Sequence, residues 1–304
     1  MKKHQTFPIP VAGSSADVRD LCLFPVRSLW ILLLLFVATT GHTFAQTQFA
    51  GWVGTFQNYK LTKKTGLYFD GQLRSTGQLQ QVHSLLLRPG MNIYFNPALT
   101  GTVGYAYIHQ QRSAGGVMDY IPEHRIWEQL LYTHPLAHST RSHSHHRAPA
   151  ATLAHRLRLE QRYLPRFHAE GNGLVHNGHA HAGRLRYFAR SVIPLSRSGD
   201  SDGKQLADSN PGGTDNTTPG NAPKAAPFTK GFFAAVQNEI FVNISGSSAV
   251  NGKFFDQNRA YLAVGYRYNR QFDLELGYMN QYISGAGSNS TNNHILQFAT
   301  YLRL

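Results

Sequence analysis

Residues 152–163 read TLAHRLRLEQRY, and this stretch decides the fold class. Charged residues occupy every second position from Arg156 to Arg162, and Leu157 and Leu159 stand between them. Successive side chains of a β-strand point to opposite faces, whereas a helix repeats every 3.6 residues. The stretch therefore predicts a strand with one charged face and one apolar face.

Ten further stretches show similar alternation and are separated by Gly, Asn, Pro and Ser clusters. Together they give eleven candidate strands, near 48–59, 66–75, 82–94, 99–109, 123–135, 152–163, 183–194, 231–244, 256–268, 272–283 and 293–304. A closed bacterial barrel has an even number of antiparallel strands, so we expect ten or twelve. The prediction is an all-β protein, a closed antiparallel transmembrane β-barrel of about 10–12 strands.

The composition agrees with this fold class. Only 15% of the 304 residues are charged, against roughly 25% in an ordinary soluble domain. The chain has 28 glycines and 12% aromatic residues, which favours strands over a helical bundle. Its 29 basic residues outnumber 16 acidic ones, but arginines that alternate with apolar residues are not a nucleic-acid-binding pattern. We therefore expect no nucleic-acid partner.

The first 45 residues have the pattern of an export signal. The apolar run 29–40 follows basic residues and precedes the small residues Thr43 and Ala45, which predicts cleavage after Ala45; an uncleaved anchor is the alternative. The only cysteine, Cys22, lies in this segment. The predicted organisation is a removed signal peptide at 1–45 and one barrel domain at 46–304, with long loops near 137–151 and 196–228. The expected location is the outer membrane of a Gram-negative cell.

The charged faces of the candidate strands form one ladder of nine arginines and four glutamates: Glu123, Arg125, Arg156, Arg158, Glu160, Arg162, Arg184, Arg186, Arg190, Glu239, Arg259, Arg267 and Glu275. One interpretation is structural, because such side chains can brace and fill a small barrel. The other is a narrow anion-attracting pore or binding cavity. Residues 127–129 read WEQ, which breaks clean alternation. The sequence therefore does not decide which face of the strand carries Glu128, and a bulge there is one explanation.

Histidines gather in two short segments, which we interpret as loops. The members with metal-ligand spacing are His143, His145, His146, His176, His179 and His181. Imidazoles at such spacing can bind Zn²⁺, Cu²⁺ or Ni²⁺. Incidental loop chemistry, a physiological metal role and a pH-sensitive gate all remain open. We assign no metal site and expect no cofactor.

Several short motifs follow one another in an order that carries a family resemblance. They are Trp52, Leu86-Leu87-Arg88-Pro89-Gly90 with Tyr94, Gly104-Tyr105, Glu123-His124-Arg125, the run 155–162, Arg184-Leu185-Arg186-Tyr187, Asn238-Glu239, Gln257-Asn258-Arg259 and Leu276-Gly277-Tyr278. With them the chain resembles the domain-of-unknown-function 2490 family of bacterial outer-membrane proteins. The resemblance implies an outer-membrane barrel and supplies no activity. The His-rich insert and the final Leu304, where such barrels often end in an aromatic residue, depart from the pattern.

Catalytic motifs give no support for an enzyme. Residues 199–203 read GDSDG, but they lie in an expected long loop without the strand and helix that a nucleophile elbow needs, and the sequence contains no HExxH and no phosphate-binding glycine loop. The expected function is an outer-membrane barrel, either structural or a narrow channel for solutes or anions with an Arg/Glu-lined lumen. An outer-membrane lipid-modifying enzyme and a secreted soluble β-rich binding protein are the alternatives. The expected partners are outer-membrane lipid, the barrel assembly machinery and a small anionic solute.

Overall fold

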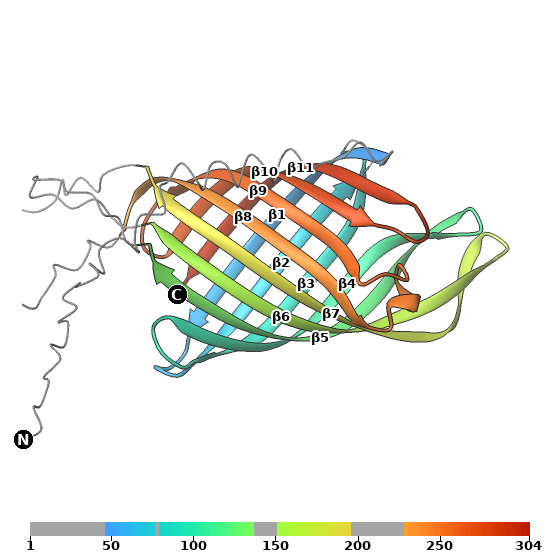
Figure 1. Ribbon diagram of the computed structural model, residues 1–304, viewed down its shortest axis with the longest axis horizontal. Helices are drawn as coiled ribbons and strands as arrows, with labels where there is room; N and C mark the ends of the chain where they lie inside the picture. The colour runs from blue at the N-terminus through green and yellow to red at the C-terminus, as the bar shows by residue number, and fades with distance from the viewer. Residues whose placement is uncertain (1–45, 77–78, 137–150, 196–227) are drawn as a thin grey trace, which may run out of the picture. The chain divides into compact units, whose positions relative to one another are not determined.

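The computed structural model describes residues 46–76, 79–136, 151–195 and 228–304. The described strands form a closed β-barrel (Figure 1). The expected signal peptide at 1–45 lies outside the described residues, as do positions 137–150 and 196–227 of the two expected long loops.

Eleven strands form the barrel, and each overlaps one of the eleven segments predicted from the sequence. They are β1 (Gln46–Lys60), β2 (Thr65–Thr76), β3 (Gln81–Tyr94), β4 (Leu99–Ala114), β5 (Val117–Pro135), β6 (Thr152–Glu170), β7 (Gly173–Pro194), β8 (Gly231–Ser245), β9 (Phe255–Arg267), β10 (Phe272–Ser284) and β11 (Ser290–Arg303). A short 3-10 helix, η2 (Ser247–Ala249), follows β8. Among the described residues, no helix has the length and apolar character needed to cross a membrane. The all-β, closed architecture is confirmed.

The expected even number of strands is wrong. Each strand pairs antiparallel with its neighbour in sequence, but β1 and β11 close the barrel as a parallel pair. Their register runs from Gln46 opposite Thr291 to Asn58 opposite Arg303. A parallel closing pair lets an odd number of strands form a closed wall, so neither β1 nor β11 is left as an open edge.

Two hairpins extend past the other strands at one end of the barrel, which we call the hairpin end (Figure 1). One joins β4 to β5 through Gly115 and Gly116, whose φ angles of 57° and 82° favour glycine. The other joins β6 to β7. Residues 176–181, which we interpreted as a loop, belong to β7, so that interpretation is wrong. The β6–β7 register shifts between Pro165 and Phe167, where a proline interrupts the pattern.

Alternation along the strands separates polar from apolar side chains. On β10, Asp273 and Glu275 are 2% and 1% exposed, whereas Leu274 and Leu276 are 37% and 54% exposed. The other strands also alternate buried and exposed positions in their central parts, but the buried positions of β1, β8, β9 and β11 include apolar residues such as Ala50, Phe233 and Ile295. The interior therefore holds most of the charged residues together with an apolar cluster, while the outer wall is largely hydrophobic, unlike the surface of an ordinary soluble domain.

Candidate functional site

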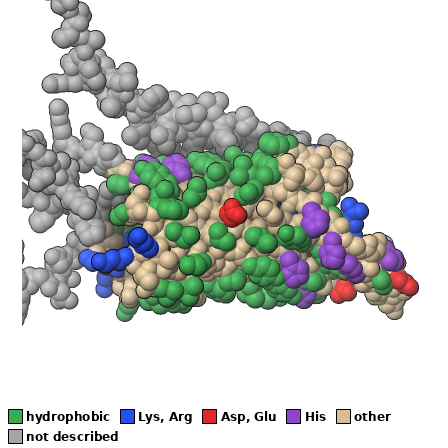
Figure 2. All heavy atoms as spheres, turned by 90° about the horizontal axis from the view of Figure 1, so that it is seen from below, with side chains coloured by type: hydrophobic (Ala, Val, Ile, Leu, Met, Phe, Trp, Pro, Cys, Tyr) green, Lys and Arg blue, Asp and Glu red, His purple; other side chains and the backbone are tan. Residues whose placement is uncertain are grey.

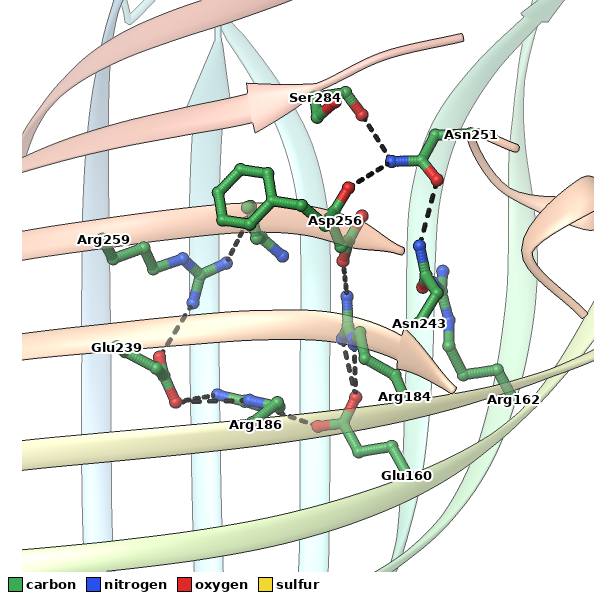
Figure 3. A network of polar contacts seen from close by, with 12 residues as sticks. Glu160, Arg162, Arg184, Arg186, Glu239, Asn243, Asn251, Asp256, Arg259 and Ser284 are labelled. Carbon is green, nitrogen blue, oxygen red and sulfur yellow. Dashed lines mark hydrogen bonds and ion pairs between the residues drawn. The ribbon is translucent and has the colours of Figure 1, made fainter. Parts of the chain in front are cut away.

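Three guanidinium groups converge on the carboxylate of Glu160 on β6, and Figure 3 shows two of them, those of Arg184 and Arg186. Arg184 donates to it from Nη2 at 2.6 Å, and Arg125 donates from Nη1 at 3.1 Å. Arg186 makes the third contact, also as an ion pair. The arginines come from β5 and β7, the two neighbours of β6. Glu160 is 2% exposed, so little solvent screens these charges.

A second node forms at Glu239 on β8. Arg186 donates to it from Nη2 at 2.7 Å and Arg156 donates from Nη2 at 2.8 Å, while Arg259 Nη1 lies 3.6 Å away. Arg186 therefore links Glu160 to Glu239 (Figure 3).

The ring of Phe241 lies among three of these arginines. The guanidinium carbons of Arg184, Arg186 and Arg259 are 5.1, 4.5 and 4.7 Å from its centroid. Cation–π attraction of this kind is stronger when the cation is desolvated, as it is here. The aromatic ring thus adds to the stabilisation of charges that the carboxylates only partly neutralise.

Further carboxylates hold the remaining arginines of the predicted ladder. Arg125 Nε and Arg162 Nε donate to Glu123 at 2.7 and 2.8 Å. Glu275 pairs with Arg190 and accepts from Tyr261 at 2.9 Å. All thirteen ladder residues lie on strands; ten are buried, and Arg156, Arg190 and Arg267 are partly buried. Twelve of them each form a salt bridge of at most 3.6 Å; the partner of Arg267 is Asp273, which is not a ladder residue.

Arg158 is the exception within the ladder. Its nearest carboxylate oxygen belongs to Glu160, at 4.0 Å from Nη1. Its Nε and Nη2 instead donate to the amide oxygen of Gln129 at 3.0 and 2.7 Å, and its guanidinium carbon lies 4.3 Å from the centre of the Trp127 ring. The side chain is held in place and 1% exposed, but no carboxylate of the described residues is in hydrogen-bond contact with it.

Sequence reasoning missed several members of the network. Arg88 on β3 pairs with Asp70 on β2 at 2.7 Å, and Asp256 accepts from Arg184 at 2.9 Å. Asp273 binds Arg267 through two hydrogen bonds of 2.8 and 2.9 Å. Alternation in 66–75 already placed Asp70 on a polar face, so its position was a usable signal. Arg88 precedes a Pro-Gly pair that obscures the alternation.

A cavity of about 360 Å³ lies inside the barrel near the hairpin end; we call it the wide cavity. Five arginines line it, together with amide and hydroxyl side chains: Arg74, Arg125, Arg162, Arg184 and Arg259. No aspartate or glutamate of the described residues belongs to its lining. Arg74 forms no ion pair within the described part of the chain, and donates to Gln72 at 2.6 and 3.1 Å. The wide cavity is therefore a polar space with a positive wall.

A second, narrow cavity of about 100 Å³ lies further from the hairpin end. Trp52 and Arg259 line both cavities and separate them. The guanidinium carbon of Arg74 is 3.9 Å from the Trp52 ring centre, and that of Arg259 is 5.1 Å away. Two cation–π contacts thus fix the indole at the boundary.

Glu128 is exposed on the outer wall, and the bulge considered for residues 127–129 is absent from the β5 pairings. The register stays continuous, with Glu128 opposite Val103 on β4 and Leu159 on β6. Its neighbours on the same face of β5 are Ile126 and Leu130, which are 44% and 49% exposed. A lone carboxylate therefore lies within an apolar surface.

The histidines considered as metal ligands divide between two parts of the chain. His143, His145 and His146 lie outside the described residues. His176, His179 and His181 lie on β7, and the first two rings are 4.5 Å apart. Within the described ranges, no group of three or more His, Cys, Asp or Glu side chains is arranged to hold a metal ion. His181 packs edge-on against Tyr163 instead.

A comparison with protein families gives one match over most of the chain. Residues 49–207 and 221–292 match the family described as "Protein of unknown function (DUF2490)". Searches of curated proteins and of solved structures found no match. The match agrees with the family resemblance seen in the sequence motifs.

Proposed function

Because the chain belongs to the DUF2490 family, whose function is unknown, we propose a function from its own geometry: a barrel of the bacterial outer membrane whose arginine-rich interior takes up small anions. Outer-membrane lipid would surround the wall, and the barrel assembly machinery would insert it. The anions would enter the wide cavity from the hairpin end. Each part of this proposal has separate support.

The distribution of side chains on the wall carries the membrane assignment. Large hydrophobic residues face outward on all eleven strands; Val103, Leu262 and Leu276 are 53%, 60% and 54% exposed. Figure 2 shows hydrophobic side chains along the wall between the two ends of the barrel. Monomeric soluble proteins rarely expose so extensive an apolar surface. A closed wall also satisfies the backbone in lipid, because no strand edge remains unpaired.

The excess of arginine inside the barrel supports an anionic solute. The wide cavity has five arginines and no carboxylate among its described lining residues. Arginine-lined pores favour anions, and a low-dielectric wall strengthens the field of those charges. The amide and hydroxyl groups beside the arginines, such as Gln110, Gln257 and Ser84, add neutral hydrogen-bonding partners for a hydroxylated anion.

The boundary at Trp52 favours binding, or slow passage, over a broad water-filled channel. Trp52 is 7% exposed and shares the boundary with Arg259, and the ion pairs of Glu160 and Glu239 occupy the interior beside it. Small barrels are filled by their side chains, whereas barrels with 16–18 strands leave an aqueous channel. We therefore expect a low conductance and a clear preference for anions.

Membrane fractionation is the first test. The protein should enter the outer-membrane fraction and migrate differently on gels with and without boiling. Recovery in a soluble periplasmic or culture fraction would contradict the membrane assignment.

Planar-bilayer recording then tests the interior. Arg74→Gln removes a cavity arginine that has no carboxylate partner among the described residues, so we expect weaker anion preference or weaker inhibition by added organic anions. Arg270→Gln, at an exposed turn, is the matched control with the same change in charge. An unchanged preference in Arg74→Gln would contradict the role of the wide cavity.

A further inference from the structure

The lining of the narrow cavity contains more arginines than carboxylates. Six arginines line it: Arg88, Arg156, Arg158, Arg186, Arg190 and Arg259. Only two described carboxylates, those of Asp70 and Glu239, share the lining. Two carboxylates outside the lining, Glu160 and Glu275, pair with Arg186 and Arg190, so Arg158 is the lining arginine without a close carboxylate among the described residues. A buried charge without a close partner is unfavourable, so a space with this lining favours a bound anion.

Three arginines of this lining have buried nitrogens that find no hydrogen-bond partner in the described part of the chain. They are Arg88 Nε, Arg156 Nε and Arg158 Nη1. Arg88 and Arg158 are only 5% and 1% exposed. A buried donor left unpaired costs about 1–3 kcal/mol, and native proteins satisfy nearly all such groups. The three arginines that carry these donors belong to strands β3 and β6 and line one cavity.

The other bonds of these arginines hold them in place. Arg88 Nη2 lies 2.7 Å from Asp70, and Arg156 Nη2 donates to Glu239 at 2.8 Å. Arg158 is held by Gln129 and by the Trp127 ring. Donors that are fixed before binding lose little conformational entropy when a ligand arrives. The cavity is thus preorganised for a compact ligand with several acceptor oxygens.

The size of the cavity limits the ligand. A water molecule occupies about 30 Å³ of liquid, so a space of about 100 Å³ holds roughly three waters or one tetrahedral oxyanion. The geometry points to a binding site for one inorganic oxyanion of the phosphate or sulfate class, held by Arg88, Arg156 and Arg158. This site goes beyond the proposed function in two ways. It lies in the narrow cavity, on the other side of Trp52 from the wide cavity, and oxyanion binding there does not depend on a membrane location.

Inorganic phosphate is the probe for this site. The purified full-length barrel is titrated with phosphate by calorimetry at constant ionic strength, and its melting temperature is followed in parallel. We expect one phosphate per narrow cavity and a melting temperature that rises with phosphate concentration, since a ligand that binds only the folded state stabilises it. Absence of both effects in the unsubstituted protein would overturn the inference.

Arg158→Gln is the decisive variant, because it removes an unpaired donor without separating a close ion pair. We expect at least tenfold weaker phosphate binding, with the response of Arg270→Gln unchanged. Arg158→Lys keeps the charge but loses the planar donor set, so it should bind phosphate with intermediate strength. It replaces Arg158→Gln as the test variant if the glutamine variant does not fold.

Arg74→Gln distinguishes this site from the wide cavity. Arg74 lines the wide cavity alone, so this variant should keep the phosphate-dependent rise in melting temperature. Loss of phosphate binding in Arg74→Gln but not in Arg158→Gln would place the ion in the wide cavity. That result would overturn the inference and leave the proposed function standing.

Discussion

Two sectors of the barrel interior are filled in different ways. In the charged sector, formed by the inward residues of β5–β7, Glu123 and Glu160 bind arginines across the strands. In the apolar sector, a buried cluster joins β1 to β8–β11: Ala50, Trp52, Phe233, Ala235, Tyr261, Ala263, Met279 and Ile295. The stability of the first sector depends on ion pairs, and that of the second depends on close packing of apolar side chains. One closed wall thus accommodates both solutions.

The largest expected effect comes from unpairing the charged sector. Glu160→Gln leaves Arg125, Arg184 and Arg186 without a shared carboxylate, so we expect the free energy of unfolding to fall by about 3–5 kcal/mol. Urea unfolding in lipid vesicles, followed by tryptophan fluorescence, measures the change. Glu170→Gln near the β6–β7 turn is the matched control, because Glu170 is exposed and a surface change is expected to stay within about 0.5 kcal/mol. Equal losses in both variants would contradict a sector held by ion pairs.

Truncation of the apolar sector is expected to have the next largest effect. Ile295 is fully buried, and its neighbour Leu296 is 47% exposed on the outer wall. Ile295→Ala should lower the free energy of unfolding by about 2–4 kcal/mol, because it leaves a cavity as well as losing buried area. Leu296→Ala should lower it less. The same urea titration compares the two, and a larger loss for Leu296→Ala would reverse the assignment of inner and outer faces.

A feature common to both sectors is a glycine that makes room for a buried aromatic ring. A Cβ at Gly104 would lie 2.3 Å from Trp127, and one at Gly265 would lie 2.2 Å from Phe233. Gly104→Ala and Gly265→Ala should each lower the free energy of unfolding by about 1–3 kcal/mol through overpacking. Gly173→Ala, with no atom within 4 Å of the added Cβ, is the control. If only one of the two variants lowers the free energy of unfolding, close packing of a glycine against an aromatic ring does not stabilise both sectors.

The smallest effect is expected on the outer wall. Of the described acidic residues, Asp119, Glu128 and Glu170 are exposed, and Glu128 alone lies away from the hairpin turns. Figure 2 shows one acidic side chain among hydrophobic ones on this face. On the proposed membrane location, Glu128→Leu should raise the free energy of unfolding in vesicles by up to about 2 kcal/mol, since a lipid-facing charge is unfavourable and Glu less so than Arg or Lys. Glu170→Leu should give no gain, and no difference between the two variants would argue against lipid at Glu128.

Local alternation made most of the fold predictable. The period of two in 152–163 predicts the strand and also predicts that Arg158 and Leu157 point to opposite faces, because successive side chains of a strand alternate between faces. The added length of β6 and β7 was not predictable in the same way. Pro165 and the spaced histidines of 176–181 resemble a loop, and pairing between the two strands overrides that local preference.

Partners across the interior could not be predicted from the sequence. Arg184 pairs with Asp256, 72 positions away, and Arg190 pairs with Glu275, 85 positions away. Such pairs depend on closure of the barrel and on the registers of all intervening strands. The ladder could therefore be identified as a set, but the geometry that leaves Arg158 without a close carboxylate could not.

The parallel pairing of β1 with β11 has a consequence for the order of assembly. Gln46 meets Thr291 and Asn58 meets Arg303, so the seam joins the first and last strands of the barrel. Contacts this distant in sequence form slowly, because a long chain must be ordered before they can stabilise it. The wall is complete only when this seam and every other strand pair have formed, and until then the charged interior has an open side. Barrel closure would then be the step that excludes water from the buried ion pairs.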